Sequence, residues 1–162
     1  RVALVSSWGS NEELRAFRNV LADGFTSFVK ADHRPVEGEV IEDDLLIRAD
    51  KNPNTHAAQA LFGHAPADIP EDTELVLVWG EGADFAGLPR GAKIVHLGAW
   101  LQPENGYADV FIPVSIQTER HGHYTNFEGV VSAFEPCRGR PDGVIDAETL
   151  FPLLAAPTGS DA

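Results

Sequence analysis

The feature that most constrains the fold is the apolar run "ELVLVW" at residues 74–79. Its apolar side chains are consecutive instead of alternating with polar ones, and a strand of this kind is buried on both faces. Such strands are typical of parallel sheets, in which crossover segments cover the faces. Gly80 and Gly82 mark the end of the strand. We therefore expect an α/β domain built around this strand.

Strands and helices alternate along the rest of the chain. Ser10 and Glu13 have the spacing of a capping box, so a helix begins there and ends before Gly24. Asn54 or Thr55 caps a second helix, which ends at Gly63. A third, short helix is expected at 146–154. The other predicted strands are "RVALVSSW", "FTSFVKA", residues 44–48, "KIVHLGAW" and "ADVFIP".

This alternation predicts a doubly wound, mainly parallel twisted sheet with helices on both faces. We assign residues 1–135 to this domain and residues 136–162 to a C-terminal extension with one short helix and a flexible tail. In such sheets ligands bind outside the carboxyl ends of the strands. The segments expected at that edge are 6–10, 50–55, 80–84 and 98–102.

The charge excludes several classes of partner. Twelve Lys and Arg against 25 Asp and Glu give a formal charge of −13, which repels nucleic acid and anionic lipid. The apolar runs are far shorter than the roughly 20 residues of a membrane span. A single cysteine, Cys137, cannot form an internal disulfide or hold an iron–sulfur cluster. No signal peptide is evident, so we expect a cytoplasmic location, and a start at Arg1 without methionine suggests a segment of a longer polypeptide.

Polar residues gather in the loop "ADKNPNTHAA", which leads into the second helix. Asp50, Asn52, Asn54 and Thr55 hydrogen-bond readily to nearby backbone, so an ordinary turn explains them. A ligand-binding loop is the competing interpretation, because edge loops of such sheets often carry sites.

The segment "ERHGHYTNFEGVV" at 119–131 offers possible metal ligands. His121 and His123, with Glu119 and Glu128, are residue types that bind zinc, but no further His or Cys completes a tetrahedral set at ligand spacing. Other sites are no better supported: the chain has neither a GxSxG nucleophile elbow nor a GxGxxG loop, and Cys137 has no evident general base.

The stretch "YADVFIPVSIQTERHGHYTNFEGVV" resembles a segment of the molybdopterin-dependent oxidoreductases. In that family a strand of the form "ADVVLP" precedes "E..GT.TN.EGR.Q". The residues that fit, in order and spacing, are Ala108, Asp109, Val110, Pro113, Glu119, Gly122, Tyr124, Thr125, Asn126, Glu128 and Gly129. The segments "DDLLIRADKNPNTHAAQAL" and "SNEELRAFRNVLADG" are similar to the family's Asn-Pro loop and "NEE" helix, so the resemblance extends over most of 1–134.

Within the family, the chain is most similar to the C-terminal region of the large iron–sulfur subunit of NADH-quinone oxidoreductase, respiratory complex I, where the cofactor site is degenerate. Val130 and Ser132 stand where the family has Arg and Gln, and His123 stands where it has Thr. Loss of the guanidinium removes a bidentate partner for a phosphate or pterin. The resemblance thus implies a structural segment without its own cofactor, in the peripheral arm of a membrane-bound complex. Its partners would be the cluster-bearing N-terminal part of the same polypeptide and other subunits of the complex.

Under this interpretation Asp50, Asn52, Asn54, Thr55, Gly122, Tyr124, Asn126 and Glu128 are vestigial cofactor-binding residues. Residues 109–113 are expected to form a buried strand, Gly122 to allow a turn, and Glu119 and Glu128 to pair with Arg120 or cap backbone. One alternative is a fragment of an active molybdopterin-dependent oxidoreductase whose loops at 50–55 and 122–129 touch the cofactor. A third interpretation is an independent nucleotide-binding α/β protein.

Overall fold

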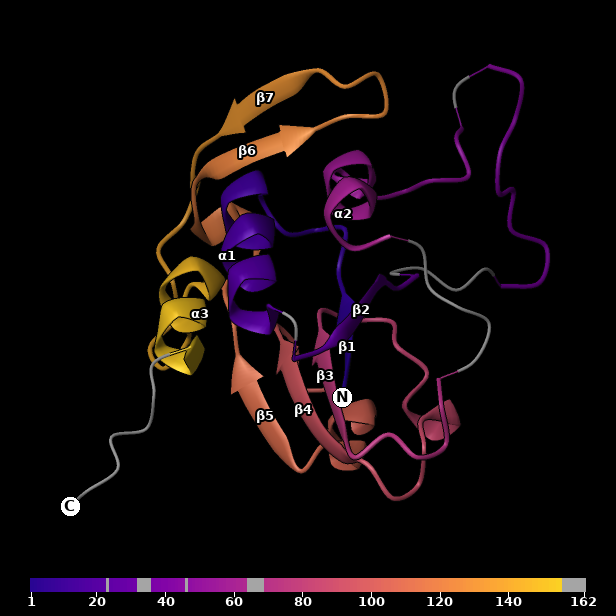
Figure 1. Cartoon of the computed structure of the whole chain (residues 1–162). Coiled ribbons are helices and arrows are strands. Elements are labelled where there is room, and N and C mark those ends of the chain that lie inside the picture. The colour runs from indigo at the N-terminus through magenta and orange to yellow at the C-terminus, as the bar shows by residue number, and fades with distance from the viewer. Residues whose placement is uncertain (23, 32–35, 46, 64–68, 156–162) are drawn as a thin grey trace.

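A computed structural model describes residues 1–22, 24–31, 36–45, 47–63 and 69–155 of the chain. Five strands form one sheet in which every pairing is parallel, in the order β2-β1-β3-β4-β5 (Figure 1). The strands are β1 (Val2–Val5), β2 (Thr26–Val29), β3 (Leu75–Trp79), β4 (Lys93–Gly98) and β5 (Val110–Pro113). The predicted parallel α/β fold is confirmed, with the most apolar strand, β3, at its centre.

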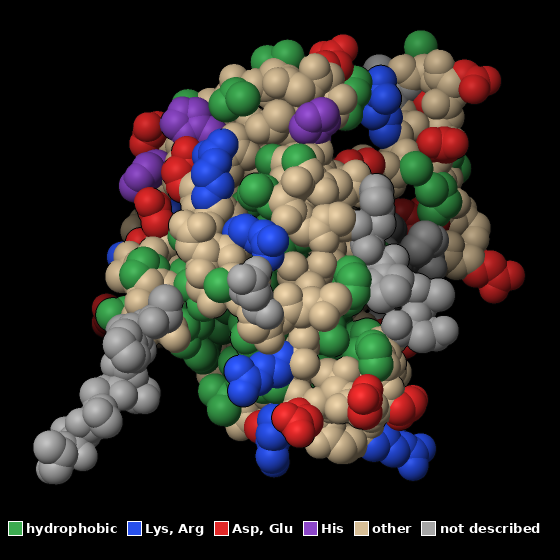
Figure 2. Space-filling view, viewed as in Figure 1, with side chains coloured by type: hydrophobic (Ala, Val, Ile, Leu, Met, Phe, Trp, Pro, Cys, Tyr) green, Lys and Arg blue, Asp and Glu red, His purple; other side chains and the backbone are tan. Residues whose placement is uncertain are grey.

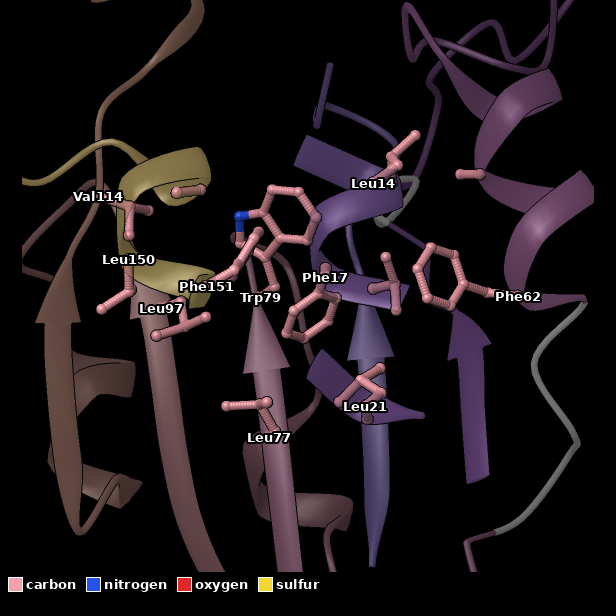
Figure 3. Packing of buried hydrophobic residues seen from close by; sticks show 14 of the residues in the cluster. Leu14, Phe17, Leu21, Phe62, Leu77, Trp79, Leu97, Val114, Leu150 and Phe151 are labelled. Carbon is pink, nitrogen blue, oxygen red and sulfur yellow. The ribbon is translucent and has the colours of Figure 1, made fainter. Parts of the chain in front are cut away.

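Three α-helices cover one face of the sheet: α1 (Asn11–Leu21), α2 (Thr55–Phe62) and α3 (Ala147–Ala155). Their apolar side chains meet every second residue of the central strands in one buried cluster (Figure 3). Phe17 of α1 lies at its centre, with its ring centroid 4.6 Å from that of Phe151 and 5.2 Å from that of Trp79. The C-terminal helix is therefore part of the core of the sheet.

The opposite face has a thinner cover. Here the alternate strand residues, such as Val76 and Val78, pack under the 3₁₀ helix η1 (Phe85–Gly87). A second 3₁₀ helix, η2 (Pro103–Tyr107), lies beside η1, and the rings of Phe85 and Tyr107 stack. Helical segments thus cover both faces, but all three α-helices lie on one of them.

Local signals explain the helix boundaries. The Ser10 hydroxyl accepts from the Glu13 amide at 3.1 Å, and the Glu13 carboxylate accepts from the Ser10 amide at 2.9 Å, so the predicted capping box is confirmed. Helix α2 begins after Asn54 and ends at Gly63, whose φ of 71° is readily adopted only by glycine.

A two-stranded antiparallel hairpin follows the sheet. The 3₁₀ helix η3 (Gln117–Glu119) leads into β6 (Gly122–Thr125), which pairs with β7 (Val131–Phe134). The hairpin packs across the N-terminal ends of α1 and α2 (Figure 1). Gly122 lies inside β6 and does not form a turn. A Cβ atom at this residue would lie 2.7 Å from Cβ of Ser10, so glycine is needed for close packing.

Two predictions about strands are wrong. Residues 44–48 form no strand in their described part: Leu45 is 83% exposed, and the Asp43 carboxylate accepts from the amides of Leu45 and Ile47. These local bonds replace strand pairing. Strand β5 is an edge strand and is only half-buried, with Val110 48% exposed.

The expected tail at 156–162 lies outside the described residues. No helix in the described part of the chain is long and apolar enough to span a bilayer.

Candidate functional site at the carboxyl edge of the sheet

A cleft of about 300 Å³ lies at the carboxyl ends of the central strands. From β1 the chain turns to β2 on one side and later reaches β3 on the other, so the strand order reverses between β1 and β3. Ligands of open α/β sheets bind at such a point. The lining residues are Ser6, Trp8, Gly9, Trp79, Gly80, Glu81, Ala99, Trp100, Val114, Ser115, Ile116, Gln117 and Arg120.

All three tryptophans of the chain line this cleft. Trp79 is 3% exposed and packs against the backbone of the β1–α1 loop, where a Cβ atom at Gly9 would come within 2.4 Å of the Trp79 ring. Trp8 and Trp100 are 39% and 54% exposed. The Trp8 indole N–H donates to the side-chain oxygen of Asn52 at 2.9 Å. Aromatic surface therefore dominates both the floor and the rim.

Glu81 supplies a fixed carboxylate. Its Oε1 accepts hydrogen bonds from the amides of Ala99 and Trp100, at 2.7 and 3.3 Å, which holds the side chain at the end of β4. Its Oε2 lies 4.0 Å from Nε2 of His96. The Lys30 ammonium donates to the Glu81 backbone carbonyl, behind the carboxylate.

Arg120 is the only cation among the described residues that line the cleft, and protein groups already engage it. Its Nε lies 3.2 Å from Oε2 of Glu13, and its two Nη groups donate to the carbonyls of Ser115 and Trp8. Arg120 is 8% exposed and Glu13 is 1% exposed. Burial raises the pKa of Glu13, and the Arg120 guanidinium opposes that shift. The ion pair joins the start of α1 to the segment before β6.

His96 lies below the cleft on the thinly covered face. Its Nδ1 accepts from the side-chain amide of Asn105 at 3.0 Å, and its Nε2 lies 3.2 Å from the Gly80 carbonyl, so both ring nitrogens are satisfied in the neutral Nε2–H tautomer. Burial lowers the pKa of His96, although the Glu81 carboxylate acts in the opposite direction. His96 is thus built to remain uncharged.

The first predicted loop lies beside this cleft. Asp50 Oδ1 accepts from the backbone and side-chain amides of Asn52 and from the Thr55 hydroxyl. Asn54 is fully buried: its Nδ2 donates to the Gly9 carbonyl at 2.7 Å and to Asn11 Oδ1 at 3.1 Å. The polar groups of this loop therefore bind other parts of the protein.

The second predicted loop meets the first one. The Thr125 amide donates to Asn54 Oδ1 at 2.7 Å, and the Tyr124 hydroxyl donates to the Trp8 carbonyl at 3.1 Å. Asn126 accepts from the amides of Glu128 and Val130 and so shapes the hairpin turn. Gly122 is buried in β6, and Glu128 is exposed at the turn. The structure thus brings both predicted loops to one edge, joined by Asn54.

In the histidine-rich segment, Glu119 caps backbone, which was one of its two expected roles, but its charge partner is not Arg120. Glu119 pairs with Arg138 at 3.2 Å and accepts from the Ile116 amide, whereas Arg120 pairs with Glu13. His123 Nδ1 lies 2.8 Å from the Glu12 carboxylate. Within the described ranges, no group of three or more His, Cys, Asp or Glu side chains could hold a metal ion.

A more open hollow of about 420 Å³ lies next to the cleft, at the end of β2. Three predicted residues line it, together with residues of the β1–α1 loop, of the end of β2 and of α2: Ser7, Val29, Lys30, Ala31, Asp50, Asn52, Thr55 and Gln59. Because Asp50, Asn52 and Thr55 hydrogen-bond to one another, the hollow offers few uncommitted polar groups.

A pterin dinucleotide fits the cleft poorly. The cleft volume is at the low end for a drug-sized ligand, its arginine is neutralised by Glu13, and Glu81 places a carboxylate where phosphate would need a cation. The amide side chain of Asn54, which the resemblance assigns to the cofactor, is buried and fully hydrogen-bonded. The contacts of these residues fit a structural role, in which they join parts of the protein, better than a cofactor-binding role.

Sequence reasoning located part of the cleft. Trp8, Glu81 and Trp100 fall within the segments predicted for the carboxyl edge. It missed Arg120 as the partner of Glu13, since the two residues are far apart in the sequence and no local pattern links them.

Comparison with protein-family models and with curated proteins finds no match for the chain.

Proposed function

We propose that the chain is a structural, cofactor-free segment of the large iron–sulfur subunit of NADH-quinone oxidoreductase, from its C-terminal molybdopterin-oxidoreductase-like region. In this proposal the iron–sulfur clusters and electron transfer belong to other parts of the parent polypeptide, which carries electrons from NADH to quinone. The segment packs against the cluster-bearing part and neighbouring subunits in the peripheral arm of the complex.

The observation that supports this proposal best is the state of Asn54. In an active pterin site, the polar groups of the loops at 50–55 and 122–129 would be directed at the ligand. Here Asn54 accepts from Thr125 and donates to the Gly9 carbonyl, so it closes the two loops onto each other and onto the β1–α1 loop. Because a buried amide cannot give up these bonds without a penalty of about 1–3 kcal/mol for each unpaired group, the loops favour a bracing role.

The alternative is a fragment of an active molybdopterin-dependent oxidoreductase. One observation favours it: both predicted loops lie at one edge of the sheet, and three predicted residues line the open hollow beside them. In this case the loops would have to rearrange around the cofactor.

Metal analysis of the protein purified from its native cells separates the two proposals. We expect no stoichiometric molybdenum or tungsten, and we expect an antibody against residues 1–155 to mark a membrane-associated complex that reduces quinone with NADH. Stoichiometric molybdenum or tungsten in the same preparation would support the alternative. Absence of the chain from every NADH-oxidising complex on native gels would overturn the first proposal.

A further inference from the structure

The cleft at the carboxyl edge combines aromatic walls with a carboxylate. Trp8, Trp79 and Trp100 line it, and two backbone amides hold Glu81 Oε1. Within the described residues Glu81 Oε2 accepts no hydrogen bond, and it lies 4.0 Å from Nε2 of His96. Tryptophan faces attract organic cations, and a carboxylate supplies the opposite charge. This combination is suited to a cationic group.

The other charges around the cleft leave Glu81 available. Of the lining residues in the described part of the chain, Arg120 alone is a cation, and its guanidinium is paired with Glu13 and bound to two carbonyls. Lys30 donates to the Glu81 backbone carbonyl and lines the neighbouring hollow, not this cleft. Burial lowers the pKa of His96, and its two ring hydrogen bonds fit the neutral imidazole, which disfavours a positive charge beneath the carboxylate.

The rim of the cleft indicates the size of the partner. Trp100 is 54% exposed and its neighbour Leu101 is 86% exposed, so the mouth carries apolar surface that a small cation would leave uncovered. A polypeptide would cover it, and exposed apolar surface rimming a pocket commonly marks a protein contact. The charge of −13 also favours a basic partner.

We propose that this cleft receives an arginine or lysine side chain of a partner polypeptide. The cation lies between Glu81 and the exposed rings of Trp8 and Trp100, and apolar neighbours of that residue cover Trp100 and Leu101. The cleft has this chemistry in any assembly, so its test does not depend on the metal and quinone assays of the proposed function.

Intrinsic fluorescence reports on the cleft directly, because all three tryptophans line it. The 162-residue chain is titrated with the peptide acetyl-Leu-Arg-Leu-amide, with the same peptide carrying citrulline, and with arginine amide. Citrulline preserves the shape of arginine without its charge. We expect a saturable change with the arginine peptide, binding at least about tenfold weaker for the citrulline peptide, and intermediate binding for arginine amide, which lacks the apolar neighbours.

Two variants locate the binding. Glu81→Gln preserves the acceptor for the Ala99 amide and removes the charge, and we expect about tenfold weaker binding of the arginine peptide. Trp100→Leu keeps an apolar rim, removes an aromatic wall and should weaken binding as well. Glu148→Gln is the matched control on the exposed surface of α3 and should bind as the wild type does. Circular dichroism verifies that each variant is folded.

Several results would overturn the proposal. Equal binding of the arginine and citrulline peptides would show that charge is not recognised, and unchanged binding by folded Glu81→Gln would place any cation elsewhere. If arginine amide bound as tightly as the peptide, the ligand would be a small free cation and not a partner polypeptide.

Discussion

Asn54 connects three segments that are far apart in the sequence. Its side chain binds the β1–α1 loop through Gly9 and the hairpin through Thr125, and it is fully buried. We expect Asn54→Ala to lower the free energy of unfolding by about 3 kcal/mol, because it leaves buried backbone groups without partners. Urea denaturation measures the change. Asn52→Ala is the control: Asn52 is half-buried and its bonds are at the surface, so its effect should stay within about 0.5 kcal/mol. Equal effects would contradict the bracing role of Asn54.

His96 gives the stability of the fold a defined pH dependence. Burial lowers its pKa in the folded chain, whereas in the unfolded chain the pKa is about 6.5. Below about pH 6.5 the unfolded chain takes up a proton that the folded chain resists, so we expect stability to fall as the pH decreases from 7.5 to 5.5.

The variant His96→Gln isolates this contribution. Glutamine does not titrate, so the loss of stability between pH 7.5 and 5.5 should be smaller in the variant than in the wild type. Glu13, whose pKa is raised by burial, contributes in the opposite sense near and above its normal pKa, and it is present in both proteins. Parallel pH profiles from urea denaturation would show that His96 is not the responsible group.

Among the elements, β6 packs closely against the residue that precedes α1. A Cβ atom at Gly122 would lie 2.7 Å from Ser10 Cβ and 3.1 Å from the Phe134 ring. We expect Gly122→Ala to lower the free energy of unfolding by about 2 kcal/mol, as overpacking does. Gly91→Ala is the matched control, since no atom lies within 4 Å of its added Cβ and its φ is not in the positive range. Thermal or urea unfolding measures the change. Equal stabilities of the two variants would contradict the expected close packing at Gly122.

Some local sequence patterns predicted strands and helices correctly, and others did not. The continuous apolar run of β3 and the capping box at Ser10 were sufficient to predict a parallel sheet and the start of α1, since both depend on neighbouring residues. The prediction of a strand at residues 44–48 was wrong because it relied on the strand-like composition of "DLLIR". The Asp43 side chain binds the amides that a neighbouring strand would need, and composition does not reveal this.

The candidate site was predictable only to the level of the sheet edge. Parallel strands bring their carboxyl ends together, so the edge location of Trp8 and Glu81 follows from the fold class. The role of Asn54 did not follow, because a buried bracing amide and a ligand-binding amide have the same local sequence. The pairing of Glu13 with Arg120 depends on the tertiary fold alone.

At the scale of the whole molecule, the longest connection between consecutive elements runs from β2 to α2. Figure 1 shows its described part projecting from the body of the protein, and Figure 2 shows acidic side chains on that projection. Residues 36–45 and 47–50 contain no helix or strand, and Val36 and Leu45 are 69% and 83% exposed. Most of the projection's described residues are exposed, which favours local opening.

A glutamate-specific protease tests this arrangement on the native protein. We expect the first cut after Glu37, Glu39 or Glu42, because cleavage needs accessible backbone and these residues lie in the projection. The two fragments should remain together during size-exclusion chromatography, since β1 pairs with both β2, before the cut, and β3, after it, and α1 packs on α2 across the same division. Mass spectrometry of a brief digest identifies the first site. A first cut within the hairpin at 122–134 would contradict the expected accessibility of the projection. Fragments that separate without denaturant would show that the sheet does not hold the two parts as one unit.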